Sequence, residues 1–139
     1  MLKFLDTKTR RKMTTPMDVH VFILQGLPGS VLDAILSRVQ FIQPVDLQNA
    51  VGLSIRTAQR RRSNPSGLLS TEQSGRAWKF VEILTTAADV LGSQAEAERW
   101  LITPAMALDR RRPIDLLDTP VGVEMVEQLL GRIEYGVYT

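Results

Sequence analysis

Four of the arginines in this chain lie in one nine-residue segment, SIRTAQRRR at residues 54–62. Arginine can pair with guanine through two hydrogen bonds, and threonine can contact a phosphate or the thymine methyl group. A serine at a helix start can hold a further phosphate through its hydroxyl and the free backbone amides. In a helix with Ile55 turned inward, Arg56, Thr57, Arg60 and Arg61 share the exposed side. The predicted DNA-binding residues are Ser54, Arg56, Thr57, Arg60 and Arg61.

The sequence around this segment fits a helix-turn-helix. A short helix at Asp46–Val51 is followed by a turn at Gly52 and by a second helix with a polar start. Glycine suits the turn because it accepts a positive φ and allows two helices to approach closely. The plainer alternative is that the last three arginines are solvated and stabilise the carboxyl end of the helix. That alternative explains Arg61 and Arg62 better than it explains Arg56.

Charge is unevenly divided along the chain. Residues 1–79 hold 12 Lys and Arg against 5 Asp and Glu, a net charge of +7, whereas residues 80–139 have a net charge of −5. The two halves suggest two different partners, one of them polyanionic, although chance segregation of solvated charges explains the same numbers. The basic run from Lys8 to Lys12 suits either an arm that follows phosphates or an ordinary solvated terminus.

Few residues are available for catalysis or metal binding. The chain has no cysteine, which excludes disulfides, thiolate metal sites and cysteine nucleophiles, and its one histidine is His20. No spacing singles out a pair of carboxylates for acid–base work. We predict no enzyme activity, no catalytic residue, no metal and no cofactor. No apolar run approaches the roughly 20 residues that cross a bilayer, so we expect no membrane contact and a cytoplasmic protein.

Almost every segment favours a helix, with capping residues at the boundaries. Thr15 and Pro16 open a first helix that ends at Gly26, although its β-branched residues would also suit a strand. Apolar residues at helical spacing follow each later cap, which predicts an all-α fold with a buried core. The other predicted N-caps are Ser30, Ser70, Ser93 and Thr119, with capping boxes at Ser70 and Ser93.

Three stretches after residue 90 differ from ordinary helical sequence: LGSQAEAERWL at 91–101, TPAMALDRRRPIDLLDT at 103–119 and VEQLLGRIEYGVY at 126–138. Together they resemble the toxin-binding domain of the Xre/MbcA/ParS-type antitoxins, over about half of the chain. The helix-turn-helix in front of them matches the two-part layout of the Xre members. The chain departs from the family pattern at Asp109–Arg111, where a Gly-rich step is common, and at Gln48, where alanine is usual.

The resemblance implies a type II antitoxin that binds and neutralises a RES-domain toxin, whose activity in the family is NAD+ degradation. It also implies that the protein represses its own operon by binding operator DNA. The implied toxin-binding residues are Arg132, Glu134, Tyr135 and Tyr138. Tyrosine and arginine are enriched in interface hot spots, which agrees with this assignment. Because short helix-turn-helix proteins read DNA in pairs, we also expect a homodimer and a higher toxin–antitoxin complex.

These expectations divide the chain into three parts: a basic arm at 1–14, a helix-turn-helix DNA-binding part at 15–74, and a toxin-binding domain at 75–139. The two helical parts are expected to pack together. The alternative function is a stand-alone helix-turn-helix transcriptional regulator whose C-terminal domain senses a ligand or a protein. A ligand-sensing regulator would carry a pocket in the acidic half of the chain.

Overall fold

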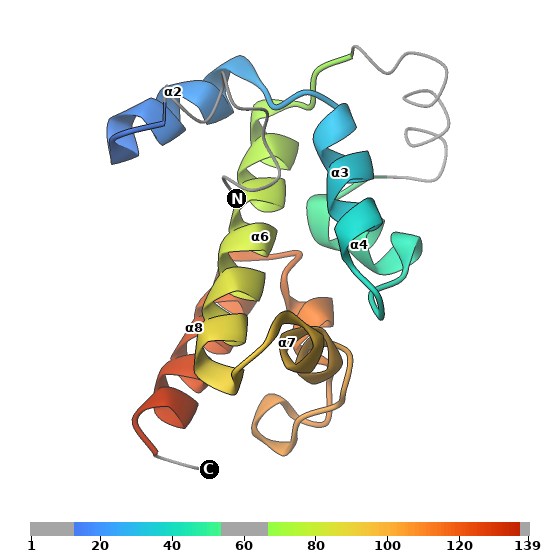
Figure 1. Cartoon of the computed structure of the whole chain (residues 1–139), viewed down its shortest axis with the longest axis vertical. Coiled ribbons are helices and arrows are strands. Elements are labelled where there is room, and N and C mark those ends of the chain that lie inside the picture. Colours follow the sequence, from blue (N-terminus) through green and yellow to red (C-terminus); the bar gives the residue numbers. More distant parts are fainter. Residues whose placement is uncertain (1–12, 54–66, 137–139) are drawn as a thin grey trace.

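The computed structural model describes residues 13–53 and 67–136 (Figure 1). Its α-helices are α2 (Pro16–Gln25), α3 (Ser30–Arg38), α4 (Pro44–Val51), α6 (Thr71–Leu91), α7 (Gln94–Leu101) and α8 (Pro120–Glu134). Two 3-10 helices, η2 (Met106–Leu108) and η3 (Pro113–Leu116), lie between α7 and α8. Within the described ranges the only β-pairing consists of two isolated bridges, Pro28 with Leu68 and Ala105 with Arg111. The predicted all-α fold is confirmed, and residues 16–25 form a helix and not a strand.

Helix α6 is the central element, because α2, α4, α7 and α8 all pack against it (Figure 1). It is 21 residues long and begins with the predicted capping box, in which Ser70 and Gln73 each accept the other's backbone N–H. It ends at Gly92, which has a left-handed backbone (φ 103°). The predicted boundary between residues 74 and 75 falls inside this helix.

Most of the predicted caps are present. Thr15 and Thr119 accept backbone N–H groups three residues on, each with a proline as the next residue. At Ser93 only half of the predicted capping box forms, because the carboxylate of Glu96 binds the guanidinium of Arg99 instead (2.8 Å). The helix expected to be capped by Ser30 begins at Ser30, with Gly29 as its N-cap and no side-chain cap bond.

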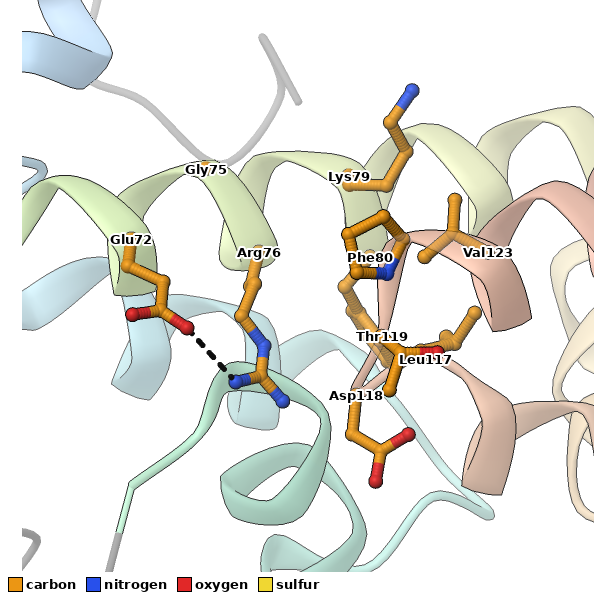
Figure 2. A pocket seen from close by; sticks show the side chains of 10 residues that line it. Glu72, Gly75, Arg76, Lys79, Phe80, Leu117, Asp118, Thr119 and Val123 are labelled. Carbon is orange, nitrogen blue, oxygen red and sulfur yellow. Dashed lines mark ion pairs between the residues drawn. The ribbon is translucent and has the colours of Figure 1, made fainter.

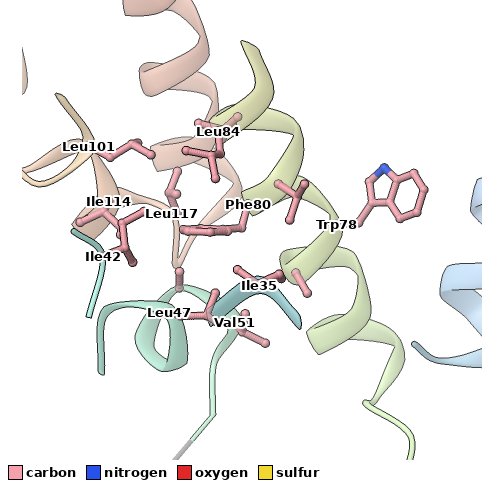
Figure 3. Close-up of a cluster of buried hydrophobic side chains, with 14 of the residues drawn as sticks. Ile35, Ile42, Leu47, Val51, Trp78, Phe80, Leu84, Leu101, Ile114 and Leu117 are labelled. Carbon is pink, nitrogen blue, oxygen red and sulfur yellow. The ribbon is translucent and has the colours of Figure 1, made fainter. Parts of the chain in front are cut away.

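One apolar core joins the two halves of the chain (Figure 3). Phe80, on α6, is almost fully buried and lies among side chains from both halves. Around it, the N-terminal half contributes Ile35, Ile42, Leu47 and Val51, and the C-terminal half contributes Leu84, Leu101, Ile114 and Leu117. Because the core is shared, the position of each half depends on the other. No helix in the described part of the chain is long and apolar enough to cross a membrane.

Candidate functional site

The described part of the predicted helix-turn-helix has the expected geometry. Helix α4 ends at Gly52, which has a left-handed backbone (φ 87°), and the next residue, Leu53, is buried. The positive φ favours glycine at this turn, and a Cβ on Gly52, 2.5 Å from Nη1 of Arg76, would also displace that guanidinium. The predicted DNA-binding residues Ser54, Arg56, Thr57, Arg60 and Arg61 lie outside the described residues, and their role stays a prediction.

Arg76 on α6 holds the carboxyl end of α4. Its Nε donates to the carbonyl oxygen of Ala50 (2.9 Å), and its Nη2 donates to that of Asn49 (3.1 Å). A cation at this end of a helix also interacts favourably with the helix dipole. The helix before the predicted DNA-reading segment is thus fixed by a side chain from the central helix.

Arg112, just before η3, holds the other end of α4. Its guanidinium binds both carboxylate oxygens of Asp115 (2.9 and 2.7 Å) and one oxygen of Asp46 (2.9 Å), which is buried in the first turn of α4. The hydrogen bonds to Asp115, and next the one to Asp46, raise the pKa of Arg112 above its ordinary value. The ion pair with Asp46 therefore joins the helix-turn-helix half to the loop region of the C-terminal half.

Glu98 on α7 holds the connection between α3 and α4. One of its carboxylate oxygens accepts the backbone N–H groups of Gln40 (2.8 Å), Phe41 (2.8 Å) and Ile42 (3.4 Å). Its other oxygen accepts a hydrogen bond from Gln94 (2.9 Å). Glu98 is only 1% exposed, so these donors replace the water that the carboxylate loses on burial.

The predicted toxin-binding residues that the structure describes lie together at the carboxyl end of α8. Tyr135 is 83% exposed, Glu134 is exposed and Arg132 is half-buried. A hollow of about 370 Å³ is lined by Gln128, Gly131, Arg132 and Tyr135. Glu134 is not among the lining residues. Tyr138 lies outside the described residues.

A second hollow, of about 220 Å³, lies beside the first, where α8 meets η2. Gln128 and Arg132 line both hollows, so the two form one continuous surface. Met125 on α8, an exposed methionine, lines the second hollow. We call this surface the α8–η2 face; its members are Ala107, Met125, Gln128, Arg132 and Tyr135.

The loop beside this face has an unusual backbone. Asp109 (φ 54°) and Arg110 (φ 63°) are consecutive non-glycine residues in the left-handed region. Two hydrogen bonds close the turn. The N–H of Arg110 donates to the carbonyl of Ala105 (3.0 Å), and the N–H of Ala105 donates to the carbonyl of Arg111 (3.1 Å). Such strain costs free energy and is common at binding sites. This loop, Asp109–Arg111, is also the segment in which the sequence departs from the family pattern.

Sequence reasoning missed Ala107, Met125 and Gln128. Met125 lies off the apolar stripe of α8, whose buried members are Val126, Leu129 and Leu130. An apolar residue on the polar side of an amphipathic helix is a signal that could have found it. Ala107 had no such signal, because its position depends on how the loop folds.

A third hollow, of about 300 Å³, lies between α6 and the start of α8 (Figure 2). Its floor includes the buried side chains of Phe80 and Leu117, and Val123 adds to its apolar lining. Among its charged lining residues, Arg76 pairs with Glu72 (Figure 2). Lys79 pairs with both Glu82 and Glu127. Within the described residues, no group of three or more His, Cys, Asp or Glu could hold a metal ion.

Comparison with known proteins gives the same assignment as the motifs. The model of the antitoxin Xre/MbcA/ParS C-terminal toxin-binding domain matches residues 86–136, which include the whole α8–η2 face. A protein named antitoxin Xre from Yersinia enterocolitica is 33% identical over 118 residues, covering 84% of this chain and 78% of that protein.

Two further relatives extend the comparison. A second antitoxin Xre, from Photorhabdus laumondii, is 31% identical over 86% of this chain and 80% of its own length. A protein from Sphingobium sp. named Prs ADP-ribosylating antitoxin is 28% identical over 89% of this chain and 82% of its own length. Identity above 30% across most of both chains, together with the domain match, shows that the chain belongs to the Xre antitoxin family.

Proposed function

We propose that this protein neutralises a RES-domain, NAD+-degrading toxin by covering it with the α8–η2 face, and represses its own operon as a homodimer. The observation that carries the toxin part is Tyr135, an aromatic side chain left 83% exposed beside Arg132 and two hollows. Large exposed aromatic and thioether groups on one surface are typical of a protein-binding site. The proposal gives the antitoxin no catalytic step, and places both partners in the cytoplasm with the operon.

The toxin proposal is tested by substituting Tyr135→Ala and, separately, Arg132→Ala. If these are hot spots, each substitution weakens toxin binding by at least about 30-fold, equivalent to about 2 kcal/mol. Affinity is measured by calorimetry with the toxin encoded beside this gene, and protection is measured as the NAD+ that remains in cells expressing both proteins. Val121→Ala is the matched control, because Val121 is exposed on the same helix but lies outside the α8–η2 face. If both variants bound the toxin with wild-type affinity, the α8–η2 face would not be the toxin-binding surface.

The chemistry of the toxin is tested separately. The name of the Sphingobium relative suggests that a toxin in this group can transfer ADP-ribose to a protein, a reaction that also consumes NAD+. Free ADP-ribose and nicotinamide as the products would support NAD+ degradation. A covalently modified target protein would instead support ADP-ribosylation and overturn the NAD+-degradation part of the proposal, while leaving the binding surface to its own test.

Operator binding is supported by the position of α4 and Gly52 directly before the arginine segment. Arg56→Ala and Arg60→Ala should each weaken operator binding by about 1–3 kcal/mol, with a steep loss of affinity as salt rises. Binding is measured by fluorescence anisotropy at several salt concentrations. Arg99→Ala is the control, since Arg99 lies on α7 and binds Glu96. Unchanged affinity in both variants would place the DNA contact elsewhere.

The alternative function, a ligand-sensing regulator, is favoured by the hollow between α6 and α8 (Figure 2). Its volume of about 300 Å³ is at the small end of the range for ligand pockets. A small molecule that alters operator affinity in wild type but not in Val123→Trp, which would fill the hollow, would support this function. A toxin complex unaffected by Val123→Trp would favour the antitoxin proposal.

A further inference from the structure

Helix α2 has two opposite apolar faces, and the structure covers one of them. Val19, Phe22 and Ile23 are partly buried and pack against the core. On the other side, Met17 is 65% exposed, Val21 42% and Leu24 54%, spaced so that they form one stripe. A helix that is apolar on both sides is normally buried on both sides. Among residues 13–53 and 67–136, the second face of α2 is therefore an exposed apolar surface suited to a further contact.

The orientation of this stripe is fixed by the body of the protein. The N–H of Leu27, just after α2, donates to the fully buried hydroxyl of Ser74 on α6 (2.8 Å). The hydroxyl of Thr71 donates to the carbonyl of Leu24 (3.3 Å), and Ile23 lies against Gly75. Helix α2 is thus held by the first turns of α6, and rotation cannot bury its outer face. It projects from the end of the molecule opposite the carboxyl terminus (Figure 1).

One more exposed apolar side chain extends the surface. Leu68 is exposed and lies beside Gly26, at the carboxyl end of α2. Adjacent to the stripe it makes an apolar patch of four residues, which we call the α2 face: Met17, Val21, Leu24 and Leu68. Exposed apolar groups gathered in this way are typical of a protein–protein interface.

The charges of α2 indicate what occupies this face. The one carboxylate of the helix, Asp18, accepts hydrogen bonds from the hydroxyl of Thr14 (2.8 Å) and from the N–H groups of Thr14 and Thr15 (3.0 Å each). The helix contains no Lys or Arg. Asp18 lies in the first turn of α2, and the rest of the helix has His20 as its one titratable residue, so most of the stripe offers a strongly charged partner nothing to pair with. In an antiparallel pair centred near Val21, the two Asp18 carboxylates would lie on opposite sides of the two-fold axis. The face is electrostatically suited to its own copy.

The spacing of the stripe also suits self-association. Met17 lies four residues before Val21, and Leu24 lies three residues after it. If two such helices pack antiparallel about a two-fold axis near Val21, Met17 of each copy meets Leu24 of the other. A two-fold interface uses the same patch on both subunits, as this arrangement does.

We propose that the α2 face joins two copies of this chain, with their α2 helices antiparallel. The choice of a second copy rests on the proposed function, in which a homodimer reads a two-fold operator. The toxin-binding surface at the end of α8 is left free in such a dimer, so each copy can still bind a toxin. The proposal thus assigns the surface that the homodimer uses.

The test is the mass of Val21→Glu in solution, measured by analytical ultracentrifugation without toxin or DNA. Burying an unpaired carboxylate against its symmetry mate should weaken dimerisation by at least about 100-fold, so the variant sediments as a monomer while wild type is a dimer. Val121→Glu is the matched control, an exposed valine in the first turn of another helix, and it should remain dimeric. A dimeric Val21→Glu, or a monomeric wild type, overturns the proposal.

A second variant covers the case in which Val21→Glu fails to fold. The chain has no cysteine, so Val21→Cys introduces one thiol per copy. A short bismaleimide should join two copies of Val21→Cys and should not join Val121→Cys, as read on a denaturing gel. Equal cross-linking of both variants contradicts the proposed axis.

Failure of the proposed function would be seen separately, because toxin binding is measured on the same variants. Val21→Glu should bind toxin with wild-type affinity as a one-to-one complex. Loss of toxin binding in Val21→Glu, with the dimer mass unchanged, would mean that the α2 face contacts the toxin and would overturn the proposal. Loss of neutralisation by Tyr135→Ala in a protein that remains dimeric concerns only the toxin surface.

Discussion

At the scale of single residues, Glu98 illustrates how a charged group can organise a chain segment far away in sequence. Its carboxylate satisfies the N–H groups of three consecutive residues, 56 to 58 positions earlier in the chain. Those residues form the connection that leads into α4, the first helix of the predicted DNA-binding motif. A carboxylate with backbone donors is a strong interaction because one partner is ionised. Glu98 is thus a structural residue with a direct influence on where α4 begins.

We predict that Glu98→Ala lowers the free energy of unfolding by about 3 kcal/mol, because three backbone donors in buried or partly buried hydrogen bonds lose their acceptor together. The measurement is urea denaturation followed by circular dichroism. Glu96→Ala is the matched control, two residues away on α7, where an exposed ion pair with Arg99 is lost. The control should cost no more than about 0.5 kcal/mol. If both substitutions lowered the free energy of unfolding equally, the hydrogen bonds of Glu98 would contribute no more to stability than the exposed ion pair of Glu96.

Asp18 gives a prediction about pH. The hydroxyl of Thr14, and next the backbone N–H groups of Thr14 and Thr15, lower the pKa of this carboxyl from its ordinary value of 3.8. The stabilising contribution of this cap is therefore complete above the ordinary pKa of 3.8 and is lost as the pH falls through the lowered pKa. An NMR titration of the Asp18 carboxyl carbon should have its midpoint below 3.8, and Thr14→Val should move the midpoint upward. A midpoint unchanged by Thr14→Val would contradict the stated cause.

At the scale of elements, α8 carries two glycines in contrasting positions. A Cβ on Gly122 would overlap the backbone carbonyl of Leu116 in η3, whereas a Cβ on Gly131 would have no atom within 4 Å. Gly122 therefore permits the close contact between α8 and η3, which in turn fixes the direction in which α8 leaves the core. Gly131 lies in the helix without that constraint.

Alanine substitutions should separate these roles. Gly122→Ala should lower the free energy of unfolding by at least about 2 kcal/mol, because α8 must shift away from η3. Gly131→Ala should raise it by about 0.5–1 kcal/mol, since alanine is the better helix former and meets no clash. Thermal and urea denaturation of both variants provide the measurement. A destabilising Gly131→Ala would reveal a contact that the structure does not contain.

The elements show what could be predicted from sequence. The caps at Thr15, Ser70 and Thr119 are local interactions over three residues, and each was predicted. The full capping box predicted at Ser93 was wrong in its second half, because Arg99, one turn further along the helix, competes for the carboxylate of Glu96. The roles of Glu98 and Arg112 depend on partners 56 to 66 residues away, which periodicity does not reveal.

The same limit applies to the candidate site. Tyr135 and Arg132 were predicted from a family motif near the carboxyl end, and the structure places them together beside a hollow. The contribution of Ala107 required the fold of the η2 loop, which is followed by two left-handed residues, Asp109 and Arg110, that no local pattern predicts. The DNA-binding residues from Ser54 to Arg61 remain predictions from sequence.

At the scale of the whole molecule, the ion pair between Arg112 and Asp46 joins the two halves over a separation of 66 residues. The pair is partly shielded from water, since Asp46 is buried and about a third of the Arg112 side chain is exposed. Together with Arg76 and the shared core, it makes α4 part of the same body as the α8–η2 face. Mobility of α4 relative to the C-terminal half is therefore restricted at both of its ends.

A double-mutant cycle measures this connection. Arg112→Ala and Asp46→Ala should each destabilise the protein, and their coupling energy should be about 1–3 kcal/mol, as for a hydrogen bond between charged groups. The control cycle uses Lys79 and Glu82, an ion pair at 3.8 Å on the surface, and should give less than about 0.5 kcal/mol. Coupling energies are obtained from urea denaturation. A coupling energy near zero for Arg112 and Asp46 would mean that the core alone joins the halves.

The unbroken length of α6 has a consequence for any assembly built from this protein. Twenty-one helical residues span about 30 Å, and no proline or hinge interrupts them. The helix acts as a spacer between the α2 end and the opposite end of the molecule. Two copies paired at their α2 ends would therefore hold their two toxins at the far ends of the complex, at a constant separation.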